Sequence, residues 1–318
     1  MAPQAEFEGQ CADAVLMIRP ASFCANPETA ASNRFQVGGG GADTAERARR
    51  ESDALAEALS DAGVTVSVVE DTAEPAKPDA CFPNNWVSFH ADGTVVLYPL
   101  LAPNRRAERR PEVIEELCRA GFRRTRTVDL SHFEAEGEFL EGTGSLVLDR
   151  HNRIAYCCRS PRTGTRPLGE FAAELGYRIV DFDARGPGGV PVYHTNVLLS
   201  VGENFALYCA DVLPRLDERS KLQNELECSG RELILISGAQ MRGFAGNLLA
   251  LRSVRGQPLI ALSAAAWSCL DPPQRRALER HGGIVTAPIP TIERHGGGSV
   301  RCMLAEVFLP RRPARARC

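Results

Sequence analysis

One order of elements recurs along this sequence: an extended run, a tight turn, a second extended run, a helix and a closing extended run. In the first complete copy, NWVSFH from Asn85 and TVVLYPL flank the turn Ala91–Gly93, which is the pattern of a β-hairpin. A helix is expected over 105–121, and Thr125–Leu130 is expected to form the closing strand. Such a period constrains the fold strongly, because each unit must bury its apolar face against its neighbours.

Four further copies follow the same order. Three begin near Phe139, His194 and Phe244, and the last is divided between SVRCMLAEVFLP near one end of the chain and AVLMIRP near the other. A repeat completed by both termini implies a closed ring, since an open array would need capping units. The sequence predicts an α/β fold, a five-bladed propeller of ββαβ modules. We expect one domain over 1–318, with its core at about 14–309 and short flexible tails. Chance periodicity in an α/β chain is the alternative.

The composition argues against several classes of protein. The net charge is -3, so neither a nucleic acid nor an anionic membrane is an expected partner. The first residues contain no basic segment followed by an apolar run, and no run reaches the roughly 18 apolar residues of a membrane span. A cytoplasmic location is therefore expected. The eleven cysteines include no CxxC spacing and are expected to be reduced thiols, mostly buried, with no metal site.

Polar residues recur at the same place in the units. Asn85, Glu141, His194, Asn247 and Cys302 each lie near the start of a hairpin, 53 to 56 residues apart. Equivalent positions in a closed ring converge on its axis. A cysteine, a histidine and a carboxylate that converge can serve as nucleophile, acid/base and orienting group. Cysteine needs such partners because its thiolate is the nucleophile and its ordinary pKa is about 8.5.

Each of these residues also has a structural interpretation. Cys302 alone could be a buried strand cysteine, and His194 a satisfied structural histidine. The glycines at 296–298 favour a site at Cys302, because they let the backbone approach a ligand closely. Glu141 lies in an otherwise apolar run, and a buried carboxylate is costly unless it is paired or used.

The motifs around these residues resemble the amidinotransferase, or pentein, superfamily. GGGSVRCM at 296–303 is similar to its glycine-rich approach to the catalytic cysteine, and EGTG at 141–144 and HTN at 194–196 to its carboxylate and histidine motifs. The segment 79–85 resembles one in dimethylargininases. The resemblance implies the propeller fold and a hydrolase of non-peptide C–N bonds without a cofactor, in which Cys302, His194 and Glu141 are catalytic. Within the superfamily, the citrulline-utilisation hydrolases look closest.

The resemblance also implies arginines that bind the α-carboxylate of an amino-acid substrate. Arg109–Arg110 and Arg162 match the two basic positions of the superfamily, and a guanidinium suits a bidentate contact with a carboxylate. We expect Arg110 and Arg162 in this role, although the choice between Arg109 and Arg110 stays open. The alternative for the 109–110 pair is a solvated helix face, because Arg105 and Arg106 lie in the same run.

Amides replace the acids that related deiminases use to bind a cationic guanidinium. The matching residues here are Asn85 and Asn196, and Asn84 replaces a further acid. A carboxamide offers one acceptor and two donors, which suits a neutral ureido group. L-citrulline is therefore the expected substrate, cleaved to ornithine, carbon dioxide and ammonia through a covalent intermediate on Cys302. The thiolate is expected to depend on a protonated His194, with help from Arg301.

Two other functions stay open. One is a guanidino-group hydrolase or deiminase that acts on arginine or a substituted arginine, and the other is a non-catalytic binding protein. A homo-oligomer is possible. The residues expected to bind the substrate are Asn85, Asn196, Asp79, Asn84, Arg110, Arg162 and Asn247.

Overall fold

The computed structural model describes residues 9–41 and 43–312, which form five three-stranded sheets. In every sheet the central strand pairs antiparallel with one neighbour and parallel with the other. The sheets are β3 (Val87–Phe89), β4 (Thr94–Leu97), β5 (Arg126–Asp129); β6 (Val147–Asp149), β7 (Ile154–Cys158), β8 (Arg178–Phe182); β9 (Leu199–Val201), β10 (Phe205–Tyr208), β11 (Glu232–Leu235); β12 (Leu249–Arg252), β13 (Pro258–Ser263), β14 (Gly283–Ala287); and β15 (Ala305–Glu306), β1 (Ala14–Arg19), β2 (Thr65–Glu70).

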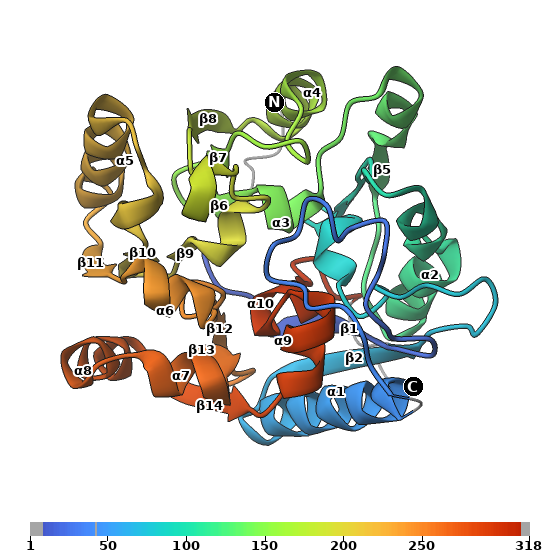
Figure 1. The fold of residues 1–318 in the computed structure, drawn as a ribbon. Helices are drawn as coiled ribbons and strands as arrows, with labels where there is room; N and C mark the ends of the chain where they lie inside the picture. Colours follow the sequence, from blue (N-terminus) through green and yellow to red (C-terminus); the bar gives the residue numbers. More distant parts are fainter. Residues whose placement is uncertain (1–8, 42, 313–318) are drawn as a thin grey trace, which may run out of the picture.

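A helix joins the second and third strands of each sheet. These helices are α1 (Thr44–Asp61), α2 (Pro111–Arg119), α4 (Thr165–Leu175), α5 (Leu216–Cys228) and α8 (Pro272–His281). They lie outside the sheets in Figure 1, whereas the short helices α3 (Gly142–Ser145) and α10 (Val300–Met303) lie near the centre. Helix α1 shows why: its buried residues Ala48, Leu55 and Leu59 recur at helical spacing, so one stripe faces the sheet and the rest faces water.

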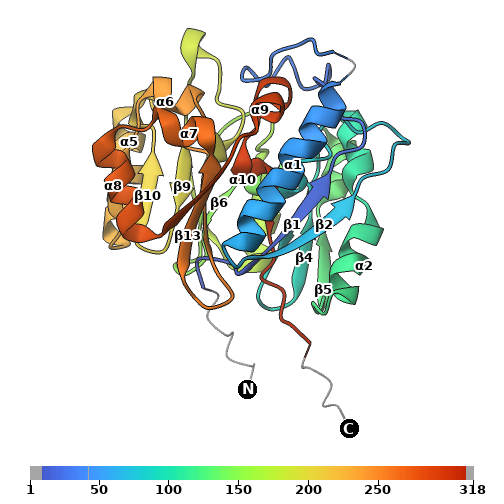
Figure 2. The same ribbon diagram turned by 90° about the horizontal axis from the view of Figure 1, so that it is seen from below.

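The two ends of the chain meet in one sheet. Strand β1 pairs antiparallel with β15, through Val15 and Glu306, and parallel with β2, through Ala14 and Thr65. Both termini emerge from the same end of the molecule (Figure 2). The split fifth unit expected from the sequence is therefore present. The tails expected to be flexible lie mostly outside the described residues.

Two segments differ from the secondary structure expected from the sequence. The run SVRCMLAEVFLP was expected to be one strand, but it forms α10 and then the two-residue strand β15. The helix expected over 105–121 is divided into a 3-10 helix, η2 (Pro103–Glu108), and α2. Pro111 explains the division, because proline lacks the N–H that a continuous helix would use and is favoured at the first helical position.

A long segment with little regular structure, residues 20–41, covers one end of the molecule. It joins β1 to the start of α1, and in Figure 1 it passes in front of α10 and α3. In Figure 2 it lies beside α9 (Pro290–Gly296), at the end opposite the termini. We call it the covering segment. Among the described residues, no helix has the length and apolarity that crossing a membrane would require.

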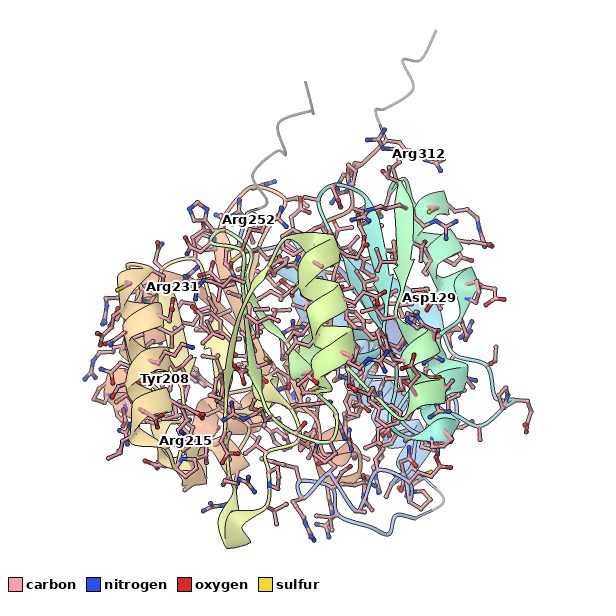
Figure 3. The ribbon with its side chains drawn as sticks, turned by 90° about the horizontal axis from the view of Figure 1, so that it is seen from above. Asp129, Tyr208, Arg215, Arg231, Arg252 and Arg312 are labelled. Atoms are coloured by element: carbon pink, nitrogen blue, oxygen red, sulfur yellow. The ribbon has the colours of Figure 1, made fainter. Side chains whose placement is uncertain are left out.

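A buried ion pair joins the second and third units. Arg231, labelled in Figure 3, donates from Nη1 to Asp149 Oδ2 at 2.5 Å and from Nη2 to Asp149 Oδ1 at 3.1 Å. Both side chains are almost fully buried. Removing one partner of such a pair leaves the other charge buried without a partner. Loss of this contact should therefore lower the stability far more than loss of an ion pair on the surface.

We predict that Asp149→Ala lowers the free energy of unfolding by about 3–5 kcal/mol, because it leaves the Arg231 guanidinium buried and unpaired. The matched control is Glu174→Ala, which removes an ion pair with Arg126 whose side chains are both more than two-fifths exposed. Such a pair contributes less than about 1 kcal/mol. Urea unfolding of the two variants measures the difference, and equal losses would contradict the structural role of the buried pair.

Candidate active site

The five recurring polar residues lie in short turns that precede the first strand of each sheet. Backbone hydrogen bonds close these turns, for example from Leu198 N to Thr195 O and from Trp86 N to Pro83 O. The turns include η1 (Pro83–Asn85), α3, η5 (Thr195–Val197), the turn at 244–247 and α10. Equivalent placement brings Asn85, Glu141, His194, Asn247 and Cys302 toward one region, as their spacing predicts.

Cys302 lies on α10 and is 3% exposed. Its Sγ is 3.3 Å from Asn247 Nδ2 and 3.6 Å from Asn196 Nδ2, with Asn196 Oδ1 at 3.8 Å. Burial raises the pKa of the thiol, while hydrogen bonds from the Ser299 backbone and from the two asparagines act in the opposite direction. The resting sulfur is therefore a thiol near neutral pH.

His194 is held by Glu141. The His194 Nε2 to Glu141 Oε2 distance is 2.8 Å, and both side chains are buried. Burial lowers the pKa of His194 to about 4, against the opposing effect of the Glu141 carboxylate. The imidazole is therefore neutral at rest near pH 7, which differs from the protonated His194 expected from the sequence. A neutral imidazole can accept a proton from the thiol or from water.

The carboxylate of Glu141 has several partners. Oε1 accepts from Leu101 N at 3.1 Å, and Oε2 accepts from Arg162 Nη1 at 3.0 Å as well as facing His194. Burial alone would raise the pKa of Glu141, but Arg162 and His194 hold that pKa far below its usual range. Glu141 thus stays ionised and fixes both the imidazole and one buried arginine.

Gly144 allows the imidazole to lie where it does. A Cβ at this position would be 2.5 Å from Asn85 Nδ2 and 2.8 Å from His194 Cε1 and Nδ1. Any larger side chain would have to displace both groups. The glycine of the EGTG motif therefore provides the space in which His194 packs.

Arg105 lies at the site, although the sequence analysis assigned it no role there. Its side chain is 2% exposed. Its Nε and Nη2 bind the two oxygens of Glu108 at 2.9 Å each, and its Nη1 donates to Asn85 Oδ1 at 3.0 Å. Burial raises the pKa of Glu108 to about 7, although Arg105 opposes this shift. Pro111 marks where α2 begins, so Arg105 belongs to the separate short helix η2. The proline is the signal in the sequence that could have indicated this.

Arg110 does not reach the site. Its Nη1 donates to Glu70 O at 3.0 Å and to Asp71 Oδ1 at 3.3 Å. It immediately precedes α2, which directs its side chain toward the end of β2 rather than toward Cys302. Arg109 pairs instead with Glu134 at 2.5 Å. The structure therefore corrects the expected position of Arg110, and Arg105 lies at the site instead, in contact with Asn85.

A narrow cavity of about 10 Å³ lies beside Cys302. Of the residues expected at the site, it is lined by Asn85, Asp79, Arg162, His194 and Cys302, together with the glycines at 296–298. Lining residues that the sequence analysis missed include Arg105, Thr29, Asn33, Phe82 and Tyr193. Asn84, Asn196 and Asn247 are buried behind this lining.

The covering segment contacts several residues that line the cavity. Asn26 Nδ2 donates to Asp79 Oδ2 at 2.7 Å, and Ser32 Oγ accepts from Arg162 Nη2 at 2.7 Å. Asn33 Nδ2 donates to the carbonyls of Gly296 and Gly297 at 3.2 Å. Gly297 has a φ of +63°, and a Cβ there would be 2.6 Å from Asn33 Nδ2. The glycines at 296–298 thus leave room for the covering segment to pack against them, and they also line the cavity. A loop of this length is often functional. The length of the segment was therefore the signal in the sequence that could have indicated its place at the site.

Asp79 keeps one oxygen free inside the site. Its Oδ1 is buried without a hydrogen-bond partner, whereas Oδ2 receives Asn26. Burial raises the pKa of this carboxyl, with Arg105 acting against the shift. A free buried oxygen of this kind can receive a donor from a ligand. Within 9–41 and 43–312, no group of three or more His, Cys, Asp or Glu side chains is placed to hold a metal ion.

Five small mixed sheets around a cysteine, a histidine and a carboxylate define a hydrolase of the pentein superfamily that acts on C–N bonds other than peptide bonds. More specifically, residues 19–309 match the family model for eukaryotic N,N dimethylarginine dimethylhydrolase. The match covers most of the chain, and the chain belongs to that family.

Solved structures share the fold. The apo structure of ArgZ, a cyanobacterial arginine dihydrolase, is 17% identical with a TM-score of 0.73, over 94% of this chain but only 41% of that chain. The N-terminal domain of ArgZ alone, bound to product, is 17% identical with a TM-score of 0.71, over 93% of this chain and 99% of that chain. A dimethylarginine dimethylaminohydrolase in its adduct with S-methyl-L-thiocitrulline is 15% identical with a TM-score of 0.62, over 92% of this chain and 99% of that chain. No curated protein matches the chain.

We predict that His194 stays neutral down to about pH 5 in the folded protein, with a pKa near the value of about 4 that burial imposes. Glu141→Gln should lower this pKa further, because it removes the negative charge that favours the imidazolium. NMR titration of the His194 imidazole measures both values. Titration of native His194 near the ordinary histidine pKa of about 6.5 would contradict the neutral resting state.

Proposed function

We propose that this chain hydrolyses a terminal C–N bond in the guanidino group of an arginine-type amino acid, with Cys302 as nucleophile. The observation that carries the proposal is the placement of Cys302 and His194 on one narrow cavity that two buried arginines also line. Membership of the dimethylarginine hydrolase family supports the guanidino substrate, as do the printed activities of ArgZ and of the dimethylarginine enzyme. We further propose that the five units form one closed five-bladed propeller domain.

The proposed amino-acid end of the substrate lies at Arg162 and Asp79. Arg162 donates to Ser32 Oγ on the covering segment, from Nη2 at 2.7 Å and from Nε at 3.3 Å. This guanidinium edge matches a carboxylate, which could replace the serine hydroxyl. The free Oδ1 of Asp79 suits the α-ammonium group. Both residues line the cavity, so one molecule could contact them and Cys302.

The proposed reaction proceeds in two steps. In the first, Cys302 Sγ bonds to the guanidino carbon, the bond from that carbon to the leaving nitrogen breaks, and His194 passes the thiol proton to the amine that departs. In the second, His194 takes a proton from water, the water oxygen bonds to the same carbon, the C–S bond breaks with its electron pair left on sulfur, and His194 returns the proton to that thiolate. The products are an amine or ammonia and the ureido amino acid. Glu141 keeps the imidazole oriented throughout.

We predict that Cys302→Ala reduces turnover to the assay background, because it removes the covalent route itself. His194→Ala should be nearly as severe, whereas Glu141→Gln should keep partial activity. The matched control is Cys228→Ala, which changes an exposed thiol. The assay follows the release of amine, citrulline and ornithine from arginine, dimethylarginine and citrulline. Turnover retained in Cys302→Ala would rule out the proposed nucleophile.

A second candidate is hydrolysis of the neutral ureido group of citrulline. The observation that favours it is the uncharged surrounding of the sulfur, which contacts the amides of Asn196 and Asn247. The nearby carboxylate of Glu141 is already engaged by His194, Arg162 and Leu101 N. A cationic guanidinium prefers a free carboxylate, whereas a ureido group can pair with amides.

We predict that Asn85→Asp and Asn196→Asp shift binding preference from citrulline toward arginine by about ten- to hundredfold. The reason is that a carboxylate facing the ureido oxygen leaves a buried polar mismatch of about 1–3 kcal/mol. Calorimetric titration in the Cys302→Ala background separates binding from chemistry. A parent protein that prefers arginine supports the guanidino reaction, and one that prefers citrulline supports the second candidate. An unchanged preference in both variants would exclude these asparagines from specificity.

A further inference from the structure

We propose that Asn247 and Asn196 form an amide site for the sulfur of Cys302, in which Asn247 is the principal donor to the thiolate. The inference rests on the proposed role of Cys302 as nucleophile and gives Asn247 a catalytic role in place of the substrate contact expected from the sequence. All three side chains are buried. The geometry of each amide supports this assignment in a different way.

The orientation of the Asn247 amide is determined by its neighbours. Its Nδ2 lies 2.9 Å from Asn196 O, 3.2 Å from Asn196 Oδ1 and 3.3 Å from Cys302 Sγ. A flipped amide would place its oxygen against two carbonyl oxygens and the sulfur, with no donor among them but a thiol proton. The N–H group must therefore face Cys302. Asn247 Oδ1 is buried without a hydrogen-bond partner. The amide therefore makes hydrogen bonds through its Nδ2 while its oxygen accepts none.

The Asn196 amide can serve both protonation states of the sulfur. Its Nδ2 and Oδ1 are almost equally distant from Sγ, at 3.6 Å and 3.8 Å. A thiol can donate to the oxygen, and a thiolate can accept from the nitrogen. The same Nδ2 also donates to Thr143 O at 3.2 Å, which limits rotation of the amide. An aspartate here could accept from the thiol but would repel the thiolate.

The neighbouring cations are committed to other groups. Arg301, adjacent to Cys302 in the chain, donates to Leu304 O and to Glu306 Oε2, both at 3.0 Å. Arg105 and Arg162 are bound by Glu108 and Glu141. Among the described residues, the side-chain hydrogen bonds to the sulfur come from the two asparagines. Among the described side chains that hydrogen-bond to the sulfur, the groups available to stabilise a thiolate are therefore neutral amides rather than cations.

This site explains how one nucleophile could attack a neutral group. Where carboxylates surround a catalytic cysteine, a cationic substrate must offset their charge before the thiolate can form. Here the amides donate to the thiolate without adding a negative charge. The ionisation of Cys302 should consequently depend on Asn247 even when no substrate is bound.

The test is the rate at which iodoacetamide alkylates Cys302, measured by peptide mass spectrometry between pH 6 and 9. This reagent is small and uncharged, and its rate follows the thiolate fraction. Loss of one hydrogen bond to a charged acceptor should raise the thiol pKa by about one to two units. We therefore expect Asn247→Ala to slow alkylation about ten- to hundredfold. Asn247→Asp, which keeps the shape but adds a charge, should slow it further.

The matched control is Asn204→Ala, at an exposed position in the β9–β10 turn, which should alkylate at the native rate. The slowing in Asn247→Asp should shrink toward low pH as its carboxyl becomes protonated, which a purely structural effect would not produce. Native rates in both Asn247 variants, or faster alkylation in Asp than in Ala, would overturn the amide site. Should Asn247→Ala fail to fold, the nearly isosteric Asp variant still decides. Turnover by Cys302→Ala would refute the proposed function separately, since alkylation does not depend on turnover.

Discussion

The fully buried carboxylate of Glu141 is the interaction on which the site depends. It holds the His194 imidazole at 2.8 Å and Arg162 Nη1 at 3.0 Å, and Arg105 Nη1 lies 3.6 Å away. Three elements from different units are thereby fixed to one group. A buried charge is tolerated only when it is paired and hydrogen-bonded, and Glu141 meets that condition with groups that the proposed chemistry also needs. The same contacts that join three of the units therefore orient the proposed acid/base and one proposed substrate-binding arginine.

Burial sets the resting charges around Cys302. It raises the pKa of the thiol and lowers that of His194 to about 4, so both partners are neutral before substrate binds. This neutrality agrees with the amides of Asn196 and Asn247, which contact the sulfur. The charged groups lie toward the covering segment, where Ser32 and Asn26 contact Arg162 and Asp79. The sulfur thus lies among amides, whereas Arg162 and Asp79 lie beside the covering segment, an arrangement that suits the proposed amino acid with a guanidino or ureido tail.

Much of this arrangement could be predicted from the sequence, because equivalent polar residues recur 53 to 56 residues apart. That period gave the five units, the split sheet at the termini and the grouping of Cys302, His194 and Glu141. The period could not predict the short turns that hold these residues, because turns closed by backbone hydrogen bonds have no periodic pattern of apolar residues in the sequence. The choice among the arginines at 105–110 depended on where α2 begins, and Pro111 fixes that point. The covering segment has no period at all, so its contacts emerged only in the structure.

The proposed mechanism depends on a covalent bond between Cys302 and the guanidino or ureido carbon of the substrate. Acid quenching during turnover, followed by intact-mass and peptide mass spectrometry, tests this directly. We expect a transient adduct on the peptide that contains Cys302, with a mass that retains the substrate carbon skeleton for arginine-type substrates or a carbamoyl group for citrulline. An adduct on another cysteine, or turnover at full rate with no adduct at any quench time, would contradict it.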